Sequence, residues 1–399
     1  MCGILIVAAA GGRPPSVDER TVCRMRDRLI HRGPDGAGLR RAGSALVGHR
    51  RLAIVDPAGG DQPWVEPPIA RPAEGPLVLA YNGELYETEE LRRSLPGPFR
   101  SRCDTEVLAR LLQIEGAAGL DRVRGMFAVA AWWPRTGRLL LARDPLGIKP
   151  LLWTSVEVDG GVEIIAGSEP AALLDHPAVR VEPDWVTLSS YLSTIRVTLD
   201  DRTMYAGIRT LRPGERIEFD LSGAVPRRRH AMDPRLASIW PDRDPESIAR
   251  VVAGEAAESA EQAATDTMRR IVADSVRRHA AAADVPVGAM LSGGLDSSII
   301  CRELRDAGGP VTSWCATGPE EDAGGDGAHA AMMAAAIDAD HHRVSVDRER
   351  FRERWPWMIQ RLGLPLGTPN EVAIHAVAES ARDRVGVLLS GEGADELMA

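Results

Sequence analysis

The chain has 399 residues, of which 44% are hydrophobic and 26% are charged, and its formal net charge is −9 at neutral pH. These proportions are those of a globular protein, and the length favours two domains. The acidic balance argues against a nucleic-acid-binding surface, no apolar run reaches the roughly 18 residues of a membrane span, and the five cysteines, without CxxC spacing, argue against zinc.

The first predicted element is an apolar strand from Gly3 to Ala9, which lacks the basic flank of a signal peptide. The odd, scattered set of cysteines favours a reducing compartment, so we expect a cytoplasmic protein without membrane or nucleic-acid partners. A helix follows, because Ser16 and Glu19 have capping-box spacing and apolar residues recur on one helical face. A Gly- and Pro-rich turn is predicted at 31–36.

Strand-like runs dominate the next part of the chain. Between them, residues 104–114 form an amphipathic helical pattern. Many strands with few helices indicate stacked sheets flanked by helices. A closing helix and a hairpin are predicted within 189–220, and the basic run 227–230 is interpreted as a solvated loop. The strands are predicted at 45–55, 77–86, 126–133, 138–143, 151–158 and 162–167.

The pattern changes in the second half, where strands alternate with helices. Apolar strands are predicted at 285–291, 311–317, 342–346 and 385–389, each separated from the next by a helical pattern. This alternation implies right-handed crossovers and a parallel sheet, whose ligands bind beyond the carboxyl ends of the strands. We therefore predict three regions, which are a first domain at 1–222, a linker at 223–246 and an α/β domain at 247–399.

The most informative stretch of the second half is the loop Leu291-Ser292-Gly293-Gly294-Leu295-Asp296-Ser297-Ser298. Its glycines and hydroxyls lie between a predicted strand and a predicted helix N-terminus, which makes a cradle suited to phosphate. It is not a Walker loop, because no Gly-Lys-Ser/Thr follows the glycines. The alternative is a serine-rich turn in which Asp296 caps the helix. A second loop, Ser390 to Glu396, follows the last predicted strand.

Cys2 is the candidate nucleophile of the first half. If Met1 is removed, one residue carries both a thiol and a free α-amine, which is the N-terminal nucleophile arrangement. An α-amine titrates at roughly 7.7–8.0, so it can serve as a base at neutral pH. The alternative is that Cys2 is only part of a buried strand.

Further segments match a known family in order and spacing. They resemble the glutaminase domain of class II glutamine amidotransferases, and the loop at Ser292 resembles the pyrophosphate loop of ATP-pyrophosphatases. Together they make the chain similar to the glutamine-hydrolysing asparagine synthetase family. The resemblance implies an α+β N-terminal nucleophile sandwich (αββα) followed by an α/β parallel-sheet ATP-pyrophosphatase domain. The matching segments of the first half are 1–4, 31–35, 49–56, 81–86, 103–106 and 143–151.

The resemblance implies roles for residues of the first domain. Cys2 would attack the side-chain amide of glutamine, and Asn82 with Gly83 would form the oxyanion hole. Arg51 would hold the α-carboxylate and Asp104 the α-ammonium group of glutamine. Each has a structural alternative, namely a hairpin turn at Asn82-Gly83, a helix cap at Asp104 and a solvated strand charge at Arg51. The same pocket would also be lined by Ile54, Val55 and Glu84.

The resemblance also implies an ATP site in the second domain, with Mg²⁺ held by Asp296 and Asp395, because carboxylate oxygens suit that ion. Glu392 would take part in forming an acyl-adenylate. The ATP-binding residues would be Leu291, Ser292, Gly293, Gly294, Asp296, Ser297, Ser298, Thr317, Ser390 and Gly391.

The resemblance stops at Ala399. Family members continue further and carry a catalytic lysine there, whereas the single lysine of this chain, Lys149, lies in the first half. Either the chain is an incomplete copy or a partner supplies the rest, and we expect the former, namely a synthetase domain that is truncated at its C-terminus.

Three functions remain open from the sequence. The first is a ligase that transfers ammonia from glutamine to a carboxylate activated as its AMP ester, with aspartate as the default acceptor. The second is a glutaminase-competent fragment with an inactive synthetase half, and the third is an amidotransferase for another carboxylate. A degenerate binding subunit is disfavoured by the intact Cys2, Asn82 and Asp104. A homodimer is left open.

Overall fold

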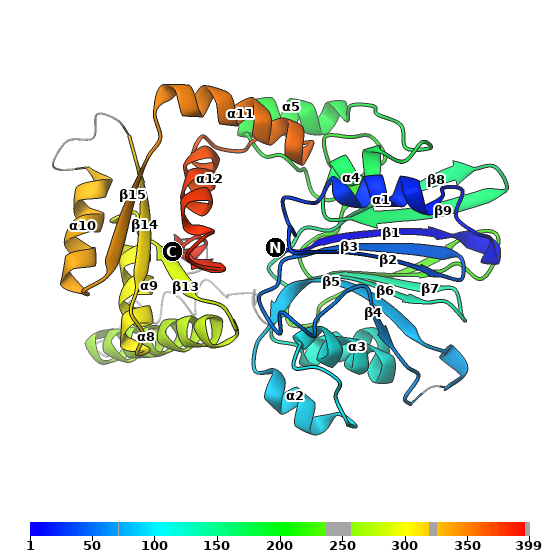
Figure 1. The fold of residues 1–399 in the computed structure, drawn as a ribbon, viewed down its shortest axis with the longest axis horizontal. Coiled ribbons are helices and arrows are strands. Elements are labelled where there is room, and N and C mark those ends of the chain that lie inside the picture. Colours follow the sequence, from blue (N-terminus) through cyan, green and yellow to red (C-terminus); the bar gives the residue numbers. More distant parts are fainter. Residues whose placement is uncertain (71, 237–256, 319–324, 396–399) are drawn as a thin grey trace. The chain divides into compact units, whose positions relative to one another are not determined.

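The computed structural model describes residues 1–70, 72–236, 257–318 and 325–395. The chain forms two compact units, which are Met1–Leu236 with Trp357–Gly367, and Ala237–Pro356 with Thr368–Ala399 (Figure 1). Part of the predicted linker, residues 237–246, lies outside the described residues. Within the described chain, no helix has the length and apolar character that crossing a membrane requires.

The first unit contains two six-stranded antiparallel sheets. The first sheet has the order β10-β8-β9-β1-β3-β2, and the second has the order β12-β11-β7-β6-β5-β4. The first consists of β1 (Gly3–Ala9), β2 (Gly36–Ala42), β3 (Ala45–Arg51), β8 (Leu152–Val158), β9 (Gly161–Gly167) and β10 (Arg209–Thr210). The second consists of β4 (Trp64–Glu66), β5 (Leu77–Leu85), β6 (Gly125–Trp133), β7 (Arg138–Arg143), β11 (Glu215–Asp220) and β12 (Arg227–Met232).

The two sheets pack face to face, and helices cover their outer faces (Figure 1). Alternate residues of β1 show why, since Ile4 and Ile6 join the core between the sheets while Leu5 and Val7 join the core under the helices. The helices α1 (Glu19–Asp27) and α4 (Pro170–Leu174) pack on the first sheet, and α3 (Asp104–Glu115) packs on the second, next to α2 (Thr88–Ser94). The predicted αββα sandwich is confirmed. The unit also contains α5 (Trp185–Thr194).

The second unit contains a four-stranded parallel sheet with the order β15-β14-β13-β16. Its strands are β13 (Val287–Met290), β14 (Thr312–Thr317), β15 (Asp340–Ser345) and β16 (Val387–Leu389). Because β13 pairs in parallel with both β14 and β16, the loops that follow β13 and β16 leave the same edge of the sheet. The helices of the second half are α8 (Ala257–Ala281), α9 (Leu295–Asp306), α10 (Asp326–Ala336), α11 (Arg348–Leu362) and α12 (Asn370–Ala381).

Helices on both faces bury this sheet. Side chains of α8, α9 and α10 pack in one cluster with Ala289 and Leu291, whereas side chains of α12 pack in another cluster with Trp314 and Val344. The predicted parallel α/β domain is therefore confirmed.

Two local predictions about the first unit are wrong. The N-cap of α1 is Asp18, whose carboxylate accepts from Thr21 N at 2.8 Å, and Ser16 instead donates to Glu163 Oε2 at 2.9 Å. The strands β10 and β11 of the segment 189–220 do not form the predicted hairpin, because β10 pairs with β8 and β11 pairs with β7. A local pattern could not show that this segment passes from one sheet to the other.

Three edge strands also depart from the sequence-based expectation. The basic run 227–230 is part of β12, an edge strand that is exposed along its whole length, and it is not a loop. The strands β2 and β4 were not predicted, and they are also at sheet edges. Edge strands have few apolar partners, so the alternation of apolar residues that marks a buried strand is weak in them.

Candidate active site

A cavity with about 520 Å³ of empty space lies beside Cys2 in the first unit. Its walls come from the residues just before β1, from β3, β5, β6 and the start of α3, and from loops between these elements, which are far apart in the sequence. The fold therefore brings the predicted glutaminase residues together. Those that line the cavity are Cys2, Arg51, Ile54, Val55, Asn82, Gly83, Glu84 and Asp104.

Cys2 directly precedes β1 and is held from two sides. Its Sγ lies 3.7 Å from the carbonyl oxygen of Leu52 and accepts from the Leu52 N–H at 3.4 Å. Arg32 Nε donates to the Cys2 carbonyl at 3.0 Å, and the Arg32 guanidinium forms an ion pair with Glu169 at 2.7 Å. Burial raises the pKa of the Cys2 thiol, while the Leu52 N–H acts in the opposite direction. The turn at 31–35 thus supports Cys2 from outside the cavity.

Asn82 and Gly83 lie inside β5, which excludes the hairpin-turn alternative. Asn82 is 1% exposed, and its side-chain Nδ2 has no hydrogen-bond partner among the described residues. A buried amide donor without a partner is costly, so its retention beside a cavity indicates a ligand acceptor. Only glycine fits next to it, because a Cβ on Gly83 would overlap the carbonyl oxygen of Met126.

Asp104 is a buried acid at the start of α3. Its Oδ2 accepts from Tyr81 OH at 2.9 Å and from Leu85 N at 3.1 Å, and the N-cap of the helix is Cys103, so the capping alternative is excluded. Burial raises the pKa of the Asp104 carboxyl, and these hydrogen bonds oppose that effect. Within the described chain, Asp104 forms no ion pair. A buried carboxylate of this kind is suited to a ligand cation.

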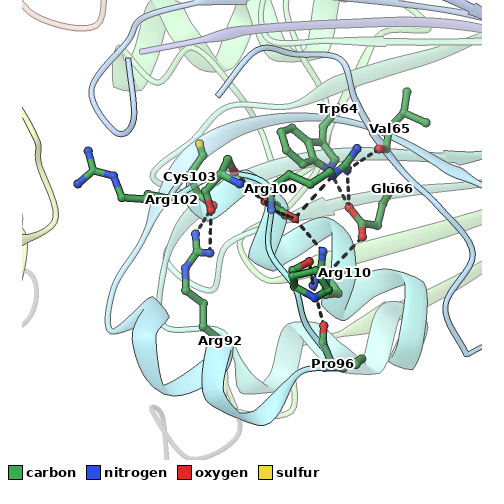
Figure 2. A network of polar contacts seen from close by, with 12 residues as sticks. Trp64, Val65, Glu66, Arg92, Pro96, Arg100, Arg102, Cys103 and Arg110 are labelled. Atoms are coloured by element: carbon green, nitrogen blue, oxygen red, sulfur yellow. Dashed lines mark hydrogen bonds and ion pairs between the residues drawn. The ribbon is translucent and has the colours of Figure 1, made fainter. Parts of the chain in front are cut away.

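A buried polar network holds the segment that leads into Asp104 (Figure 2). Glu106 is fully buried and accepts from Arg110 Nη2 at 2.7 Å, and Arg110 also forms an ion pair with Glu66 at 3.2 Å. Arg92 donates to the Cys103 carbonyl at 2.8 Å. These bonds hold the backbone before α3 with residues that do not line the cavity, in addition to the bonds that Tyr81 and Leu85 make to the Asp104 carboxylate.

Arg51 holds the loop that contributes Ile54 and Val55 to the cavity. Its guanidinium donates to the carbonyl oxygens of Val55, at 3.2 Å, Asp56, at 2.7 Å, and Pro57, at 2.7 Å. The residue is 8% exposed, so the interpretation as a solvated strand charge is wrong.

Sequence reasoning missed several residues of this cavity. Gln62 connects two of its walls, because its Oε1 accepts from Tyr81 N at 2.7 Å and its Nε2 donates to Thr105 Oγ1 at 3.3 Å. No local pattern marks Gln62. The other unpredicted lining residues are Met1, Leu52, Gly60, Tyr81, Cys103, Thr105, Met126 and Lys149. For Lys149 a signal existed, since it is the one lysine of the chain.

A second cavity, with about 980 Å³ of empty space, lies at the carboxyl ends of β13, β14 and β16. Both predicted nucleotide loops contribute to it. The predicted residues that line it are Leu291, Ser292, Gly294, Asp296, Ser297, Ser390, Gly391 and Glu392. The predicted residues Gly293, Ser298, Thr317 and Asp395 do not line it, whereas Asp326, Asn370 and Ile374 line it and were not predicted.

The two loops touch at the N-terminus of α9. Ser292 Oγ and Ser297 Oγ are 3.0 Å apart, and Gly293 has a φ of +85°, which bends the chain tightly before the helix. The N-cap is Gly294, so Asp296 is not the cap. A Cβ on Gly391 would lie 2.8 Å from Asp296 Cβ, so only glycine allows the second loop to approach the first.

These residues fit a nucleotide phosphate better than an isolated metal ion. Hydroxyls and a helix N-terminus converge on the cavity and supply partial positive charge. Among the described residues, no group of three or more His, Cys, Asp or Glu side chains is arranged to hold a metal. Asp296 lines the cavity and Asp395 is exposed outside its lining. A magnesium ion here would therefore need oxygen ligands from the nucleotide as well as from Asp296.

Comparison with known families assigns both halves of the chain. Residues 1–229 match the model of a family described as a glutamine amidotransferase domain, and residues 267–399 match one described as asparagine synthase. The first match covers more than half of the chain.

Several curated relatives match over the whole chain, and two of them illustrate the range. A Mycobacterium tuberculosis protein, provisionally named a glutamine-hydrolysing asparagine synthetase, is 34% identical over 100% of this chain and 60% of its own length. Glutamine-hydrolysing asparagine synthetase 1 of Bacillus subtilis is 29% identical over 100% of this chain and 58% of its own length. The chain thus spans less than two thirds of the length of each.

A solved structure titled as the allosteric regulatory enzyme of purine biosynthesis is 16% identical over 86% of this chain and 80% of that chain, with a TM-score of 0.42. This likeness is too low to support an inference about function.

Proposed function

This chain belongs to the family that joins a glutamine amidotransferase domain to an asparagine synthase domain, and we propose that it couples glutamine hydrolysis to ATP-dependent amide formation. The observation that carries the proposal is the Cys2 cavity. One buried space contains a thiol, the amide donor of Asn82, which has no partner among the described residues, and the acid Asp104, which forms no ion pair with any of them. A glutamine molecule would supply the electrophile, the oxyanion and the ammonium group that these three side chains lack.

Glutamine hydrolysis would begin when removal of Met1 gives Cys2 a free α-amine. The Cys2 thiol would attack the amide carbon of the substrate, and the thiol proton would pass to the α-amine. Negative charge on the amide oxygen would be stabilised by Asn82 Nδ2 and the Gly83 N–H. Ammonia would then leave, and water would hydrolyse the thioester to release glutamate.

Two charged residues would orient the substrate. Asp104 would bind its α-ammonium group, and this ion pair would offset the burial that now raises the pKa of the Asp104 carboxyl. Arg51 would bind the α-carboxylate, for which its guanidinium would exchange bonds now made to the carbonyls of Asp56 and Pro57. Ile54, Val55 and Glu84 would complete the binding pocket.

The second unit would activate a carboxylate with ATP. The loop from Ser292 to Ser298 would hold the phosphates, Ser390 and Gly391 would contact the nucleotide, and Glu392 would act where the acyl-adenylate forms. Leu291 and Thr317 are proposed near the adenine or ribose. Magnesium, held by Asp296 with the phosphates, would neutralise charge on the leaving pyrophosphate. Ammonia would then attack the acyl-adenylate and release AMP.

Aspartate is the acceptor we propose, because relatives from Mycobacterium tuberculosis and Bacillus subtilis that match the whole chain are named asparagine synthetases. A different carboxylate is the alternative acceptor. The acceptor would reach the cavity near Asn370 and Ile374, which are among the lining residues contributed by α12.

The test is to measure glutamate release and AMP formation separately, with Cys2→Ala and Glu392→Gln. Cys2→Ala should reduce glutamate release to the uncatalysed background, while Glu392→Gln should abolish AMP formation and leave glutamate release unchanged. Cys23→Ala is the matched control, because Cys23 is a partly exposed thiol on α1 that does not line the cavity.

Each result separates the candidate functions. Glutamate release that survives Cys2→Ala would refute the proposed nucleophile. Glutamate release without AMP, from any carboxylate offered to the unmodified chain, would favour the glutaminase-only alternative. AMP formed with aspartate would establish the ligase.

A further inference from the structure

Lys149 is a buried lysine that the proposed chemistry does not use. It is 7% exposed and lines the same cavity as Met1, Cys2 and Asn82. Within the part of the chain that the structure describes, its ammonium group forms no hydrogen bond and no ion pair. Burying an unpaired ammonium is costly, so a functional reason for its position is required.

The loop that carries Lys149 is rigidly tied to the sheet. The Asp144 carboxylate accepts from Phe127 N at 3.2 Å, from Ile148 N at 2.9 Å and from Lys149 N at 3.0 Å. On the other side, Arg143 Nε donates to the Lys149 carbonyl at 2.9 Å. These bonds satisfy backbone groups of the loop. The part of Lys149 that remains for the cavity is its side chain.

Lys149 differs from the other cations near Cys2. Arg32 is balanced by its ion pair with Glu169, and Arg51 is bonded to loop carbonyls and lies 3.3 Å from Asp61. Lys149 has no such contact, although the carboxylates of Glu84 and Asp144 favour its charged form. Among the described residues that line the cavity, Lys149 therefore carries a positive charge that no fixed partner balances.

We propose that Lys149 is a positioning residue of the glutaminase site. Its ammonium keeps the α-amine of Cys2 unprotonated and thereby sets the lower pH limit of glutamine hydrolysis. This inference rests on the proposed function of the Cys2 cavity. The amine must be free of a proton to accept the one that leaves the Cys2 thiol. A cation beside it opposes a second positive charge at the same place.

The electrostatics of the cavity agree with this role. In the structure Met1 is present and half exposed, and burial of its amine, assisted by Arg32 and Lys149, lowers the pKa of the Met1 amine to about 5. Cys2 and Asp35 oppose this shift, and burial with Arg32 lowers the pKa of Lys149 itself. Once Met1 is removed, the α-amine of Cys2 would lie in the same cavity and be exposed to the same cations. The other charged residues that line the cavity or act on these groups are Arg51, Glu84, Asp104 and Asp144.

The sign of the expected effect follows from the charge. The Lys149 ammonium opposes protonation of the α-amine and of the Cys2 thiolate. Removing it therefore raises the pKa of both groups. The unprotonated amine is then lost at a higher pH, so the acidic limb of the activity profile moves upward. If the pKa of the acidic limb rises by about one unit, kcat/KM falls about tenfold at pH values below the limb and does not change on the plateau.

The first experiment compares Lys149→Met with Lys149→Arg. We expect Lys149→Met to move the acidic limb of kcat/KM upward by about one pH unit, and Lys149→Arg to keep the limb of the unmodified protein. The pH dependence of iodoacetamide alkylation at Cys2, read peptide by peptide, should shift in the same direction. Cys23 is the internal reference, because it lies outside the cavity and should not shift.

The alternatives give different results. Unchanged limbs and alkylation profiles in Lys149→Met would refute the proposal. Equal loss in Lys149→Met and Lys149→Arg at every pH would also refute it, because a proton-accepting or purely structural lysine would behave in that way. If the unmodified protein hydrolyses no glutamine, the proposed function fails, while the alkylation profile still decides whether Lys149 acts on Cys2.

A second measurement needs no variant. Since Lys149 is the one lysine of the chain, labelling of amines with carbon-13 methyl groups gives signals from two sites only, which are Lys149 and the N-terminus. We expect the pKa of Lys149 to lie above the pKa of the acidic limb of activity, so that Lys149 is still charged at the pH where that limb occurs. Titration at or below that limb would refute the proposal.

Discussion

The two cavities of this protein are built in opposite ways. Polar side chains of the Cys2 cavity are buried, with Asn82 1%, Asp104 5% and Lys149 7% exposed. The nucleotide cavity has its polar groups on two loops at a sheet edge, where Ser292 and Glu392 are exposed. The first cavity combines residues of antiparallel strands with a helix start and buried loops, and the second is formed largely by the turns that follow parallel strands.

This difference follows from the two chemistries. Attack on an amide needs a dry site, where fixed donors meet charge that develops on one oxygen atom. A triphosphate already carries its charge, and backbone N–H groups at a helix N-terminus can bind it without deep burial. The Cys2 cavity therefore depends on supporting contacts behind it, whereas the nucleotide cavity depends on how closely two loops approach.

The largest expected effect tests the support behind the Cys2 cavity. Glu106→Gln removes a fully buried charge from between Arg110 and Arg100, and we expect it to destabilise the first unit by about 3–5 kcal/mol. Urea denaturation followed by tryptophan fluorescence measures this loss.

Glu379→Gln is the matched control in the second unit. Glu379 also meets two arginines, Arg350 and Arg354, but its side chain is 37% exposed, so we expect a loss of at most about 1 kcal/mol. Equal losses from the two variants would contradict the claim that the Cys2 cavity depends on a buried polar support behind it.

The next largest effect concerns the oxyanion donor. Asn82→Ala should lower kcat for glutamine hydrolysis by about 10²–10³-fold, or about 2.7–4 kcal/mol, because the lost donor meets charge that exists only in the transition state. KM should change far less. Steady-state assays of glutamate release, with thermal melting to verify folding, measure both constants. A rise in KM at constant kcat would instead make Asn82 a ground-state binding residue.

The smallest effect concerns the approach of the two loops. Gly391→Ala places a Cβ within 3.0 Å of the backbone at Asp296 and Ser297, so the loops must separate. We expect the affinity for ATP with magnesium to fall about tenfold, or about 1.4 kcal/mol, by isothermal titration calorimetry.

Gly309→Ala is its control, because a Cβ there meets no atom within 4 Å. An unchanged affinity in Gly391→Ala would show that the contact between the loops does not shape the nucleotide site.

Much of the fold was predictable because its strands are strongly apolar. β1 and β7 were predicted with their observed bounds, since buried strands carry continuous apolar runs that end at polar residues. The edge strands β2, β4 and β12 were missed or misread because an edge has no strong apolar pattern. The cap of α1 was misplaced at Ser16, whose hydroxyl has a distant partner in Glu163.

The candidate site was predictable where a motif holds several of its residues. The segments at Cys2, Asn82 and Asp104 contain the proposed chemistry in short strings that can be matched in order. Gln62, by contrast, enters the cavity through hydrogen bonds to two different elements, and no string around it indicates that position. Thr317 shows the opposite failure, because it is the last residue of a strand as predicted and still does not line the cavity.

The sequence by itself determined the chemistry available to this protein, namely a thiol at position 2, an amide donor in β5 and a glycine-rich loop before a helix. Such properties depend on residue type and on neighbours along the chain. Only the tertiary structure decided which groups are buried, which are paired and which are not. Lys149 is the clearest case, because pairing and burial depend on distances through space between residues that the chain separates widely.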